Sequence, residues 1–494
     1  MRGSGSWRFA VRFAAAAAFA ACGDANVNGA PGTADETLGD VEGAIAEVGG
    51  TEFESTETEF EFEVDIQTET ETEFETETET ETETETETEF ETETETETET
   101  EFETEFESEF EIETETEFET EIVTTPESLP PADLALLTGP PYLMWVTQTE
   151  VSVRWETTVP LVGRVDYGPD DTLGLSVSEP SARTTHELRL TGLPPANDNS
   201  YRVVFDGGAL PVRQFRTAPP DDSTDPFRFI VWGDNQNGPT TFDDLVLWMG
   251  SFDPDFALSV GDCVQNGTRA EYRSQLFTPM LGFGDRVPFL VAAGNHERYS
   301  DPDASLFAEY FSQPGDEHCF GWRYGGLFVL VLDTDLGLDG PTGQRACIDS
   351  HLASPAAQTA KIQAVTFHKP PRVEFWFGGY LAFTDAMEAP WVRQDLEPLL
   401  ESHGVDIVFN GHNHLYAYTP VTPGGITWVT TGGGGGQLDS PGFLGIWRVG
   451  TWPQIQKTVS EYHFLSVTMD GAELSVEAID IHGDVLDAFT VTGD

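Results

Sequence analysis

Positive charge is scarce in this chain. Its 494 residues include 23 Lys and Arg against 88 Asp and Glu, which gives a net charge of -65 at pH 7. Proteins bind nucleic-acid phosphates mainly through Lys and Arg, so we expect no nucleic-acid partner. Long apolar runs are also missing, because none reaches the roughly 18 residues that a membrane-spanning helix needs. The sequence therefore excludes a nucleic-acid-binding protein and a protein that crosses the membrane with a helix.

About half of the negative charge lies in one segment. Residues 51–121 contain 33 Glu, one Asp and no Lys or Arg. Glu alternates there with Thr or Phe for some 65 residues, whereas an ordinary strand has about 3–10 residues. An extended chain would place these Glu side chains on one face with nothing to neutralise them. We predict a disordered acidic spacer at 51–124, after a disordered linker at 22–50 and before a Pro-rich linker at 125–141.

The first 21 residues have the three regions of a signal peptide. Arg2, Arg8 and Arg12 form a basic start, residues 13–21 form a short apolar run, and small residues precede Cys22. This junction resembles the lipobox of bacterial lipoproteins, in which Cys22 becomes the lipidated first residue. The alternative is a plain cleaved signal with an incidental cysteine. The resemblance implies export and a lipid anchor in the bacterial cell envelope, at the outer membrane or cell surface.

Residues 142–217 have the pattern of a small domain made of strands. Short alternating stretches such as 150–155 and 187–190 are separated by Gly and Pro turns. Evenly spaced short strands within about 80 residues are typical of a β-sandwich. We expect Trp155 and Tyr201 in its core. A Pro- and Asp-rich boundary at 217–222 then leads to a second domain at 226–494.

In this second domain, five apolar stretches of strand length each end in polar side chains. Taken singly, such an end is usually only a turn. Continuous apolar runs are typical of buried parallel strands, whose carboxyl ends gather at one edge of the sheet. Carboxylate, amide and imidazole donors suit hard divalent or trivalent ions, so the repetition predicts a metal site. The side chains at these ends are Asp234, Gln236, Asp262, Asn295, His296, His368, His412 and His414.

The order of these motifs resembles a known family. Gly-Asp, Gly-Asp, Gly-Asn-His-Glu, Val-x-x-His and Gly-His-x-His follow one another as in the metallophosphoesterase superfamily. The purple-acid-phosphatase-like branch is the most similar, and the glycine-rich loop at 432–436 also resembles that branch. The resemblance implies an α/β fold: a fibronectin III-like β-sandwich at 142–217, then a two-sheet α/β/β/α metallophosphoesterase domain at 226–494.

The resemblance also implies a dinuclear centre of two divalent or mixed-valence ions, Fe, Zn or Mn, bridged by Asp262. His296 would be the general acid or a phosphate contact. The other implied ligands are Asp234 and His414 for the first ion, and Asn295, His368 and His412 for the second.

Two positions depart from the family pattern. Gln236 stands where the superfamily often has a histidine, and Gln265 stands where the purple branch has a tyrosine. The first ion therefore lacks an imidazole or a phenolate that relatives use. Gln236 could bind through its amide oxygen, or both glutamines could be polar residues at the rim of the site.

Three cysteines remain after Cys22, which is an odd number. Export permits disulfides. Cys319 and Cys347 are the expected pair, because Cys263 directly follows a predicted metal ligand. The alternative is three ordinary buried thiols.

The function that these observations predict is metal-dependent hydrolysis of a small-molecule phosphate monoester outside the cytoplasm. A phosphodiesterase or nucleotidase with the same site is one alternative. A non-catalytic surface lipoprotein with a degenerate metal site is another. A third is an adhesion or cation-binding protein dominated by the β-sandwich and the acidic tract. Nothing in the sequence indicates an oligomeric state.

Overall fold

The computed structural model describes residues 129–377, 389–422, 424–439, 446–448 and 452–493. These residues all belong to one compact unit, Thr116–Asp494. The expected signal peptide, Cys22, the linker at 22–50 and the acidic spacer at 51–124 lie outside the described residues and stay predictions. Within the described residues, no helix combines the length and apolar character that a membrane crossing requires.

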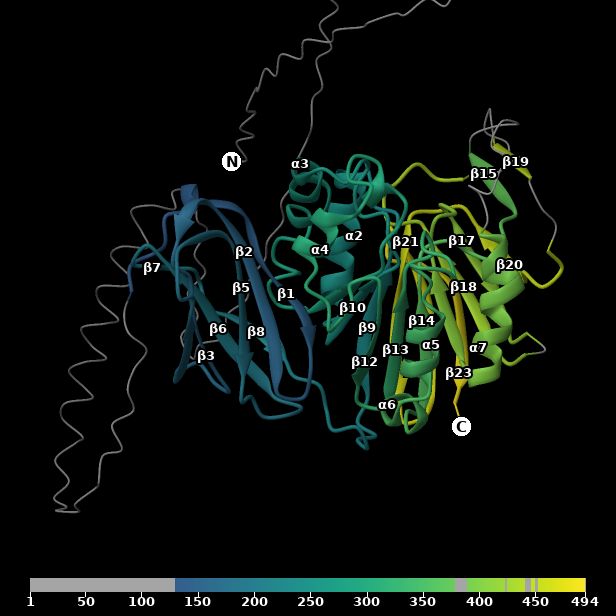
Figure 1. Cartoon of the computed structure of the whole chain (residues 1–494), viewed down its shortest axis with the longest axis horizontal. Coiled ribbons are helices and arrows are strands. Elements are labelled where there is room, and N and C mark those ends of the chain that lie inside the picture. Colours follow the sequence, from purple (N-terminus) through teal and green to yellow (C-terminus); the bar gives the residue numbers. More distant parts are fainter. Residues whose placement is uncertain (1–128, 378–388, 423, 440–445, 449–451, 494) are drawn as a thin grey trace, which may run out of the picture. The chain divides into compact units, whose positions relative to one another are not determined.

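Two large sheets form the part that carries the motifs (Figure 1). In the first sheet, three short strands run parallel and three long antiparallel strands from the end of the chain extend their edge. In order across the sheet these are β23 (Val485–Thr492), β22 (Glu473–Asp480), β21 (His463–Asp470), β9 (Phe227–Trp232), β10 (Phe256–Ser259) and β11 (Phe289–Val291). The parallel strands are buried except at Arg228 of β9, which explains their mostly apolar sequences.

The second sheet has a parallel centre and antiparallel edges. Its strands, in order, are β12 (Cys319–Tyr324), β13 (Leu327–Leu332), β14 (Ile362–Thr366), β16 (Ile407–Asn410), β18 (Thr427–Thr431), β17 (Tyr416–Thr419) and β20 (Lys457–Val459). A separate two-stranded ribbon pairs β15 (Phe375–Phe377) with β19 (Ile446–Arg448).

The core lies between the two sheets and continues on their outer faces. In β13, Leu327, Val329 and Val331 belong to the core shared with the first sheet. The alternate residues Phe328, Leu330 and Leu332 pack in a second cluster with the helices. This division follows from the two-residue period of a strand. The helices of that cluster are α5 (Arg345–Leu352), α6 (Pro355–Gln358), η5 (Val392–Leu396) and α7 (Glu397–His403).

Helix α2 (Pro239–Ser251) covers the first sheet, where Phe242 stacks on Trp232 of β9. The order is therefore helix, sheet, sheet and helix, as Figure 1 shows. The predicted mixed α/β architecture with several sheets is confirmed. Strand ends from both sheets meet at one edge, which is where the metal site is expected.

The N-terminal part is mostly strands, and three of them extend the first sheet. β1, β2 and β5 continue that sheet beyond β11, because Met144 of β1 pairs in parallel with Phe289. A separate sheet has the order β4-β3-β6-β7, with β8 paired to β6. Trp155 and Tyr201 are both 1% exposed, so the prediction that they are core residues is confirmed. The strands are β1 (Leu137–Val146), β2 (Glu150–Leu161), β3 (Arg164–Gly168), β4 (Leu175–Ser178), β5 (Arg183–Thr191), β6 (Asp198–Phe205), β7 (Gly208–Ala209) and β8 (Arg213–Arg216).

Part of the expected Pro-rich linker at 125–141 is ordered structure. A short 3-10 helix, η1 (Leu134–Leu136), leads directly into β1. Pro140 and Pro141 fall at a shift in the β1–β2 register, between the pairs made by Gly139 and Tyr142. A proline has no N–H to donate to a neighbouring strand, and irregular positions of this kind tolerate it. The two prolines therefore mark an irregularity inside a strand.

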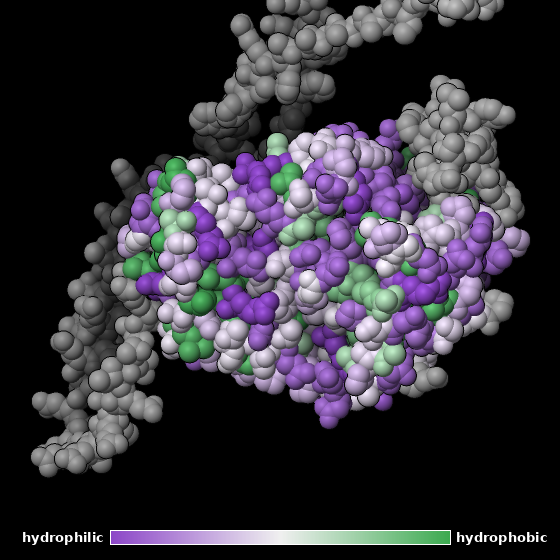
Figure 2. Space-filling view, in the orientation of Figure 1, coloured by the Kyte–Doolittle hydropathy of each residue, from purple (hydrophilic) through white to green (hydrophobic). Residues whose placement is uncertain are grey.

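Figure 2 shows one face of the described surface, on which hydrophilic residues predominate and hydrophobic ones form small separate groups. Exposed apolar side chains that are scattered in this way are normal for a water-soluble surface.

Candidate metal centre

The predicted ligands follow directly on strand ends of both sheets. Asp234 follows β9, Asp262 follows β10, His368 follows β14, and His412 follows β16. Asp234, Asp262 and His412 have φ angles of 60°, 53° and 66°, in the left-handed region. Residues other than glycine occupy this region at a cost of about 1–3 kcal/mol, typically at functional sites. Tight turns at three strand ends thus direct their side chains into one place.

Three of the predicted ligands converge closely. The Nε2 atom of His368 lies 2.9 Å from the Oδ2 atom of Asp262 and 3.1 Å from the Nδ1 atom of His412. One ligand atom of each residue lies within 4.8 Å of the others, and all three side chains are buried. The Nδ1 atom of His368 lies 3.0 Å from the carbonyl oxygen of Val260. Because a carbonyl only accepts, Nδ1 carries a hydrogen and Nε2 faces the centre, as in metal-ligating histidines.

Two amide side chains present buried oxygens to this region. Asn295 donates from Nδ2 to the hydroxyl of Tyr299 at 3.0 Å, and its Oδ1 atom has no hydrogen-bond partner among the described residues. The Nε2 atom of Gln236 lies 3.0 Å from the Nε2 atom of His414 and 3.5 Å from the Oδ2 atom of Asp262. Its Oε1 atom is likewise buried and unpartnered. A buried acceptor without a partner costs about 1–3 kcal/mol, so these oxygens fit a bound cation.

Asp234 and His414 lie next to this group. The Asp234 carboxylate accepts from the backbone N–H of His412 at 2.9 and 3.0 Å. The Nε2 atom of His414 lies 3.4 Å from the Oδ1 atom of Asp234, and its Nδ1 atom lies 2.7 Å from the carbonyl oxygen of Gln437. Burial lowers the pKa of His414, but the hydrogen bond to Asp234 and its charge outweigh burial and raise the pKa to about 9. Six of the seven predicted ligands are therefore linked by these contacts. The seventh, Asn295, directly precedes His296, whose backbone N–H donates to Asp262 at 2.8 Å.

The surroundings keep Asp262 ionised. Burial favours the neutral acid, but the nearby imidazoles of His368 and His296 hold the pKa of Asp262 well below its usual range. Its Oδ1 atom also accepts from the backbone N–H of His296 at 2.8 Å. A ligand carboxylate must be deprotonated to bind a metal, so this environment suits the central role.

Glu297 is a site residue that sequence reasoning missed. Its side chain is fully buried, and its carboxylate accepts from the backbone N–H groups of Asp262, Cys263 and Gly294 at 3.1, 2.7 and 2.8 Å. Burial, reinforced by the charge of Asp262, raises the pKa of Glu297 to about 8. It ties the loop after β10 to the loop after β11. The sequence signal was its place after Asn295 and His296, which does not distinguish a backbone anchor from a ligand.

The glycine-rich loop packs against the first motif. The N–H of Gly434 donates to the carbonyl of Gly233 at 2.9 Å, and the N–H of Gly436 donates to that of Asp234 at 2.7 Å. A Cβ atom on Gly434 would lie 2.3 Å from the Gly233 oxygen, which is closer than real contacts allow. This close packing therefore requires glycine at position 434, and the two hydrogen bonds fix the turn that carries Asp234.

His296 lies at the rim of the cluster. Its Nδ1 atom is 2.7 Å from the carbonyl oxygen of Gln265, its Nε2 atom is 3.8 Å from the Oδ2 atom of Asp262, and 17% of its side chain is exposed. Its ring lies against that of Tyr299 at 4.4 Å between centroids. The backbone of Gln265 thus orients the imidazole, so that Nε2 is the nitrogen facing the centre.

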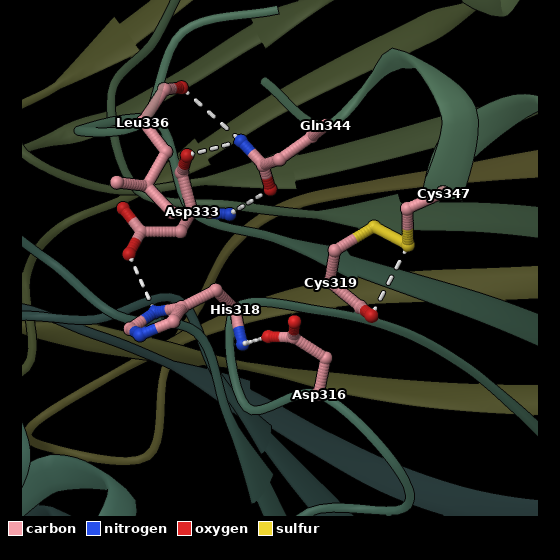
Figure 3. Close-up of a disulfide and its surroundings, with 7 residues drawn as sticks. All are labelled: Asp316, His318, Cys319, Asp333, Leu336, Gln344 and Cys347. Atoms are coloured by element: carbon pink, nitrogen blue, oxygen red, sulfur yellow. Dashed lines mark hydrogen bonds and ion pairs between the residues drawn. A yellow bond between two sulfur atoms is a disulfide. The ribbon is translucent and has the colours of Figure 1, made fainter. Parts of the chain in front are cut away.

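Two basic residues beside the motifs are neutralised by carboxylates. Arg298 pairs with Asp333, which also pairs with His318 at 2.8 Å, and Lys369 pairs with Asp335. Figure 3 shows the contact of His318 with Asp333, and next to it the disulfide.

Cys319 and Cys347 form a disulfide with a Cα–Cα distance of 6.4 Å, which is the pair expected from the sequence. It joins the start of β12 to α5 (Figure 3). Cys263 is a buried free thiol.

The chain is similar to known phosphoesterases. Residues 227–416 match the family model of calcineurin-like phosphoesterases. Purple acid phosphatase 15 of Arabidopsis thaliana is 27% identical over 291 residues, which cover 51% of this chain and 53% of that protein. The chain spans about half the length of the curated relatives it matches.

Two solved structures share the fold. The purple acid phosphatase PPD1 from yellow lupin (Lupinus luteus) seeds aligns with a TM-score of 0.62 and 18% identity, over 72% of this chain and 74% of that one. The structure of PhoD aligns with a TM-score of 0.55 and 13% identity, over 74% and 92%.

Proposed function

We propose that this chain, which is similar in sequence and fold to purple acid phosphatases, is a metallophosphoesterase that hydrolyses small-molecule phosphate monoesters with two metal ions. The observation that carries this proposal is the cluster at the sheet edge. Asp262, His368 and His412 meet there, and the predicted ligands Gln236 and Asn295 have buried amide oxygens without a partner among the described residues. Unpaired buried oxygens of this kind support a bound cation, because folded proteins pair nearly all buried polar atoms.

The two ions would share Asp262 and would otherwise be bound by different residues. Asp262 would contact both ions, since its Oδ2 atom lies near His368 on one side and Gln236 on the other. The remaining ligands would be Asp234, Gln236 and His414 for the first ion, and Asn295, His368 and His412 for the second. When bound, two such cations activate a water molecule and neutralise the charge of the phosphoryl oxygens.

Other residues of the chain would donate a proton to the leaving group and hold the metal ligands in position. His296 is placed to protonate the leaving oxygen, because its Nε2 edge faces the centre while 17% of the side chain remains exposed. The carbonyl of Gln265 holds the other nitrogen and so keeps this edge in place. Glu297 fixes the two loops that carry Asp262 and Asn295.

A substrate panel tests this proposal. We would use residues 22–494 with Cys22→Ser, which removes the signal and the lipid site but keeps the rest of the chain. Aryl phosphate monoesters should be hydrolysed faster than the corresponding diesters, chelation should abolish turnover, and Fe, Zn or Mn should restore it. Faster diester hydrolysis would instead support the phosphodiesterase alternative. Bound metal without turnover of any ester would support the non-catalytic alternative.

We further propose that the N-terminal strands form a fibronectin III-like sandwich and that the chain is exported and anchored through Cys22. The strands β1, β2 and β5 at one end of the first sheet, together with the separate sheet of β3, β4, β6, β7 and β8, support the first part. The basic start, the apolar run and the small residues before Cys22 support the second. Metabolic labelling with palmitate tests the anchor: wild type should incorporate label and fractionate with membranes, whereas Cys22→Ser should do neither. Label in Cys22→Ser would contradict it.

The acidic tract is proposed to act as a spacer without a part in the chemistry. It carries 33 Glu without one Lys or Arg between residues 51 and 121. Deleting 51–121 should leave the turnover rate unchanged, and scattering should show an extended tract in the full-length ectodomain. A lost rate or a compact tract would contradict the spacer.

A further inference from the structure

A small cavity of ≈ 10 Å³ lies among the strands that carry the metal ligands. Its lining includes Arg372, Asn410 and Trp428, but none of the residues proposed to bind metal. Asn410 is the last residue of β16, two residues before His412, and Arg372 follows His368 by four. The cavity therefore lies between the segment that follows His368 and the end of the strand that leads to His412.

The polar groups of the lining residues have one notable property in common. Four of their buried nitrogen atoms have no hydrogen-bond partner among the described residues. They are the Nε and Nη1 atoms of Arg372, the Nδ2 atom of Asn410 and the Nε1 atom of Trp428. Asn410 and Trp428 are 1% and 3% exposed. Buried N–H groups are nearly always paired in folded proteins, so donors gathered at one cavity indicate a bound acceptor.

Arg372 is the one charged residue of the cavity lining, and Glu397 balances its charge. Arg372 donates from Nη2 to both carboxylate oxygens of Glu397 at 2.8 Å, which leaves its other two nitrogens free for the cavity. The Arg372 guanidinium also lies over the Trp428 ring, 5.9 Å from its centroid. Arginine stays protonated in proteins. No Asp or Glu is among the residues that line the cavity.

Few acceptors face these donors. The Oδ1 atom of Asn410 already accepts from the hydroxyl of Thr430 at 2.7 Å, which leaves its Nδ2 as the free end of the amide. The other side-chain oxygens of the lining are the hydroxyls of Thr419 and Thr430. The lining thus has four unpaired donors and two such hydroxyls, and this excess of donors favours a ligand that only accepts hydrogen bonds.

We propose that this cavity binds one small monovalent anion of the halide class. The volume of ≈ 10 Å³ is about what one water-sized particle needs, which excludes phosphate and other polyatomic anions. The anion would accept from Arg372, Asn410 and Trp428. It would thereby connect the segment after His368 with the end of the strand that leads to His412.

Anomalous scattering of bromide tests the site directly. Crystals of the exported chain (residues 22–494, Cys22→Ser), grown with metal and sodium bromide, should show an anomalous peak between the guanidinium of Arg372 and the indole nitrogen of Trp428. Trp428→Phe should lose the peak, because it removes one donor while keeping an aromatic side chain. The matched control is Trp452→Phe, whose indole N–H already donates to the Val373 carbonyl at 3.1 Å outside the cavity lining. Density without an anomalous signal in wild type would identify water and overturn the proposal.

Thermal unfolding gives a second, independent measurement. At constant ionic strength, replacing sodium acetate by sodium chloride should raise the Tm of the wild type progressively with chloride concentration. Trp452→Phe should show the same rise. Trp428→Phe and Arg372→Lys should show little or none. An equal Tm in both salts, or an undiminished rise in Trp428→Phe, would overturn the proposal.

Discussion

The Nε2 atom of His368 and the Nδ1 atom of His412 face each other at 3.1 Å, beside the carboxylate of Asp262. The two histidines come from neighbouring parallel strands, β14 and β16, which pair through Ala364 and Ile407. Two residues that are 44 positions apart in the chain thus meet because their strands end together. Two imidazole nitrogens and an ionised carboxylate in such proximity form a set that a cation can bind.

Tyr299 is predicted to position a metal ligand. Its hydroxyl accepts from the Nδ2 atom of Asn295 at 3.0 Å, so the amide oxygen is turned away from it and left for the ion. Tyr299→Phe should weaken metal binding by about 10–100-fold, which is the usual effect of removing a group that hydrogen-bonds to a metal ligand. Competition with a chelator measures this change. Tyr418→Phe, which alters a tyrosine stacked on Phe489, is the control. Unchanged affinity in Tyr299→Phe would show that the contact has no such role.

Glu297→Gln is predicted to loosen the two loops that carry Asp262 and Asn295. The carboxylate accepts three backbone N–H groups, and an amide would replace one acceptor by a donor that faces them. We expect a loss of about 1–3 kcal/mol in the free energy of unfolding, together with weaker metal binding. Chemical denaturation measures the first quantity. The exposed Glu473→Gln should change neither, and equal stability of both variants would contradict the role of Glu297.

Acid stability should depend on His463. This side chain is buried, with Nε2 3.1 Å from the hydroxyl of Thr431 and Nδ1 2.8 Å from the Glu461 carbonyl. Burial lowers its pKa to about 4, whereas the unfolded chain takes up the proton near pH 6.5. Neutral His463 therefore contributes fully to the free energy of unfolding above about pH 6.5. This contribution, roughly 3 kcal/mol, is lost as the pH falls towards 4.

Unfolding measured between pH 6.5 and 4 tests this prediction. His463→Gln should show a shallower fall in stability than the wild type, and the exposed His482→Gln should behave like the wild type. An unchanged slope in His463→Gln would contradict the prediction.

Loss of the disulfide is predicted to destabilise the fold. Cys319 and Cys347 are 28 residues apart in sequence, and a closed loop of this length stabilises by about 3 kcal/mol in the chain-entropy model. Cys347→Ser should lower the free energy of unfolding by about this amount, measured by denaturation. Mass spectrometry of unreduced wild type should find one disulfide and the free thiol of Cys263. Three free thiols in oxidised material would contradict the pairing.

The metal cluster could be predicted from sequence for a simple reason. Each buried parallel strand has a continuous apolar sequence, and its end is marked by an abrupt change to Asp, Asn or His. Parallel strands place such ends at one edge, so residues as distant as Asp234 and His414 could be grouped before their contact was visible. Glu297 was missed because a carboxylate that accepts backbone N–H groups has no distinguishing sequence pattern.

Other features depend on contacts that no local pattern records. The N-terminal strands join the first sheet through one parallel pair, Met144 with Phe289. Pro140 and Pro141 looked like linker residues, because their tolerance depends on a register shift in β1. The unpaired donors of Arg372 and Trp428 lie 56 residues apart in the chain and meet only in the folded protein.

The central claim is that Asp262 organises a metal centre that hydrolyses phosphate esters. The most direct measurement is the initial rate of aryl phosphate hydrolysis by Asp262→Asn, in saturating metal and next to Gln236→Ala and the exposed Asp470→Asn. The account predicts that Asp262→Asn loses more than about 100-fold, beyond the usual effect of residues that only support a ligand. Gln236→Ala should lose less, and Asp470→Asn should match the wild type. Wild-type activity in Asp262→Asn would contradict the account.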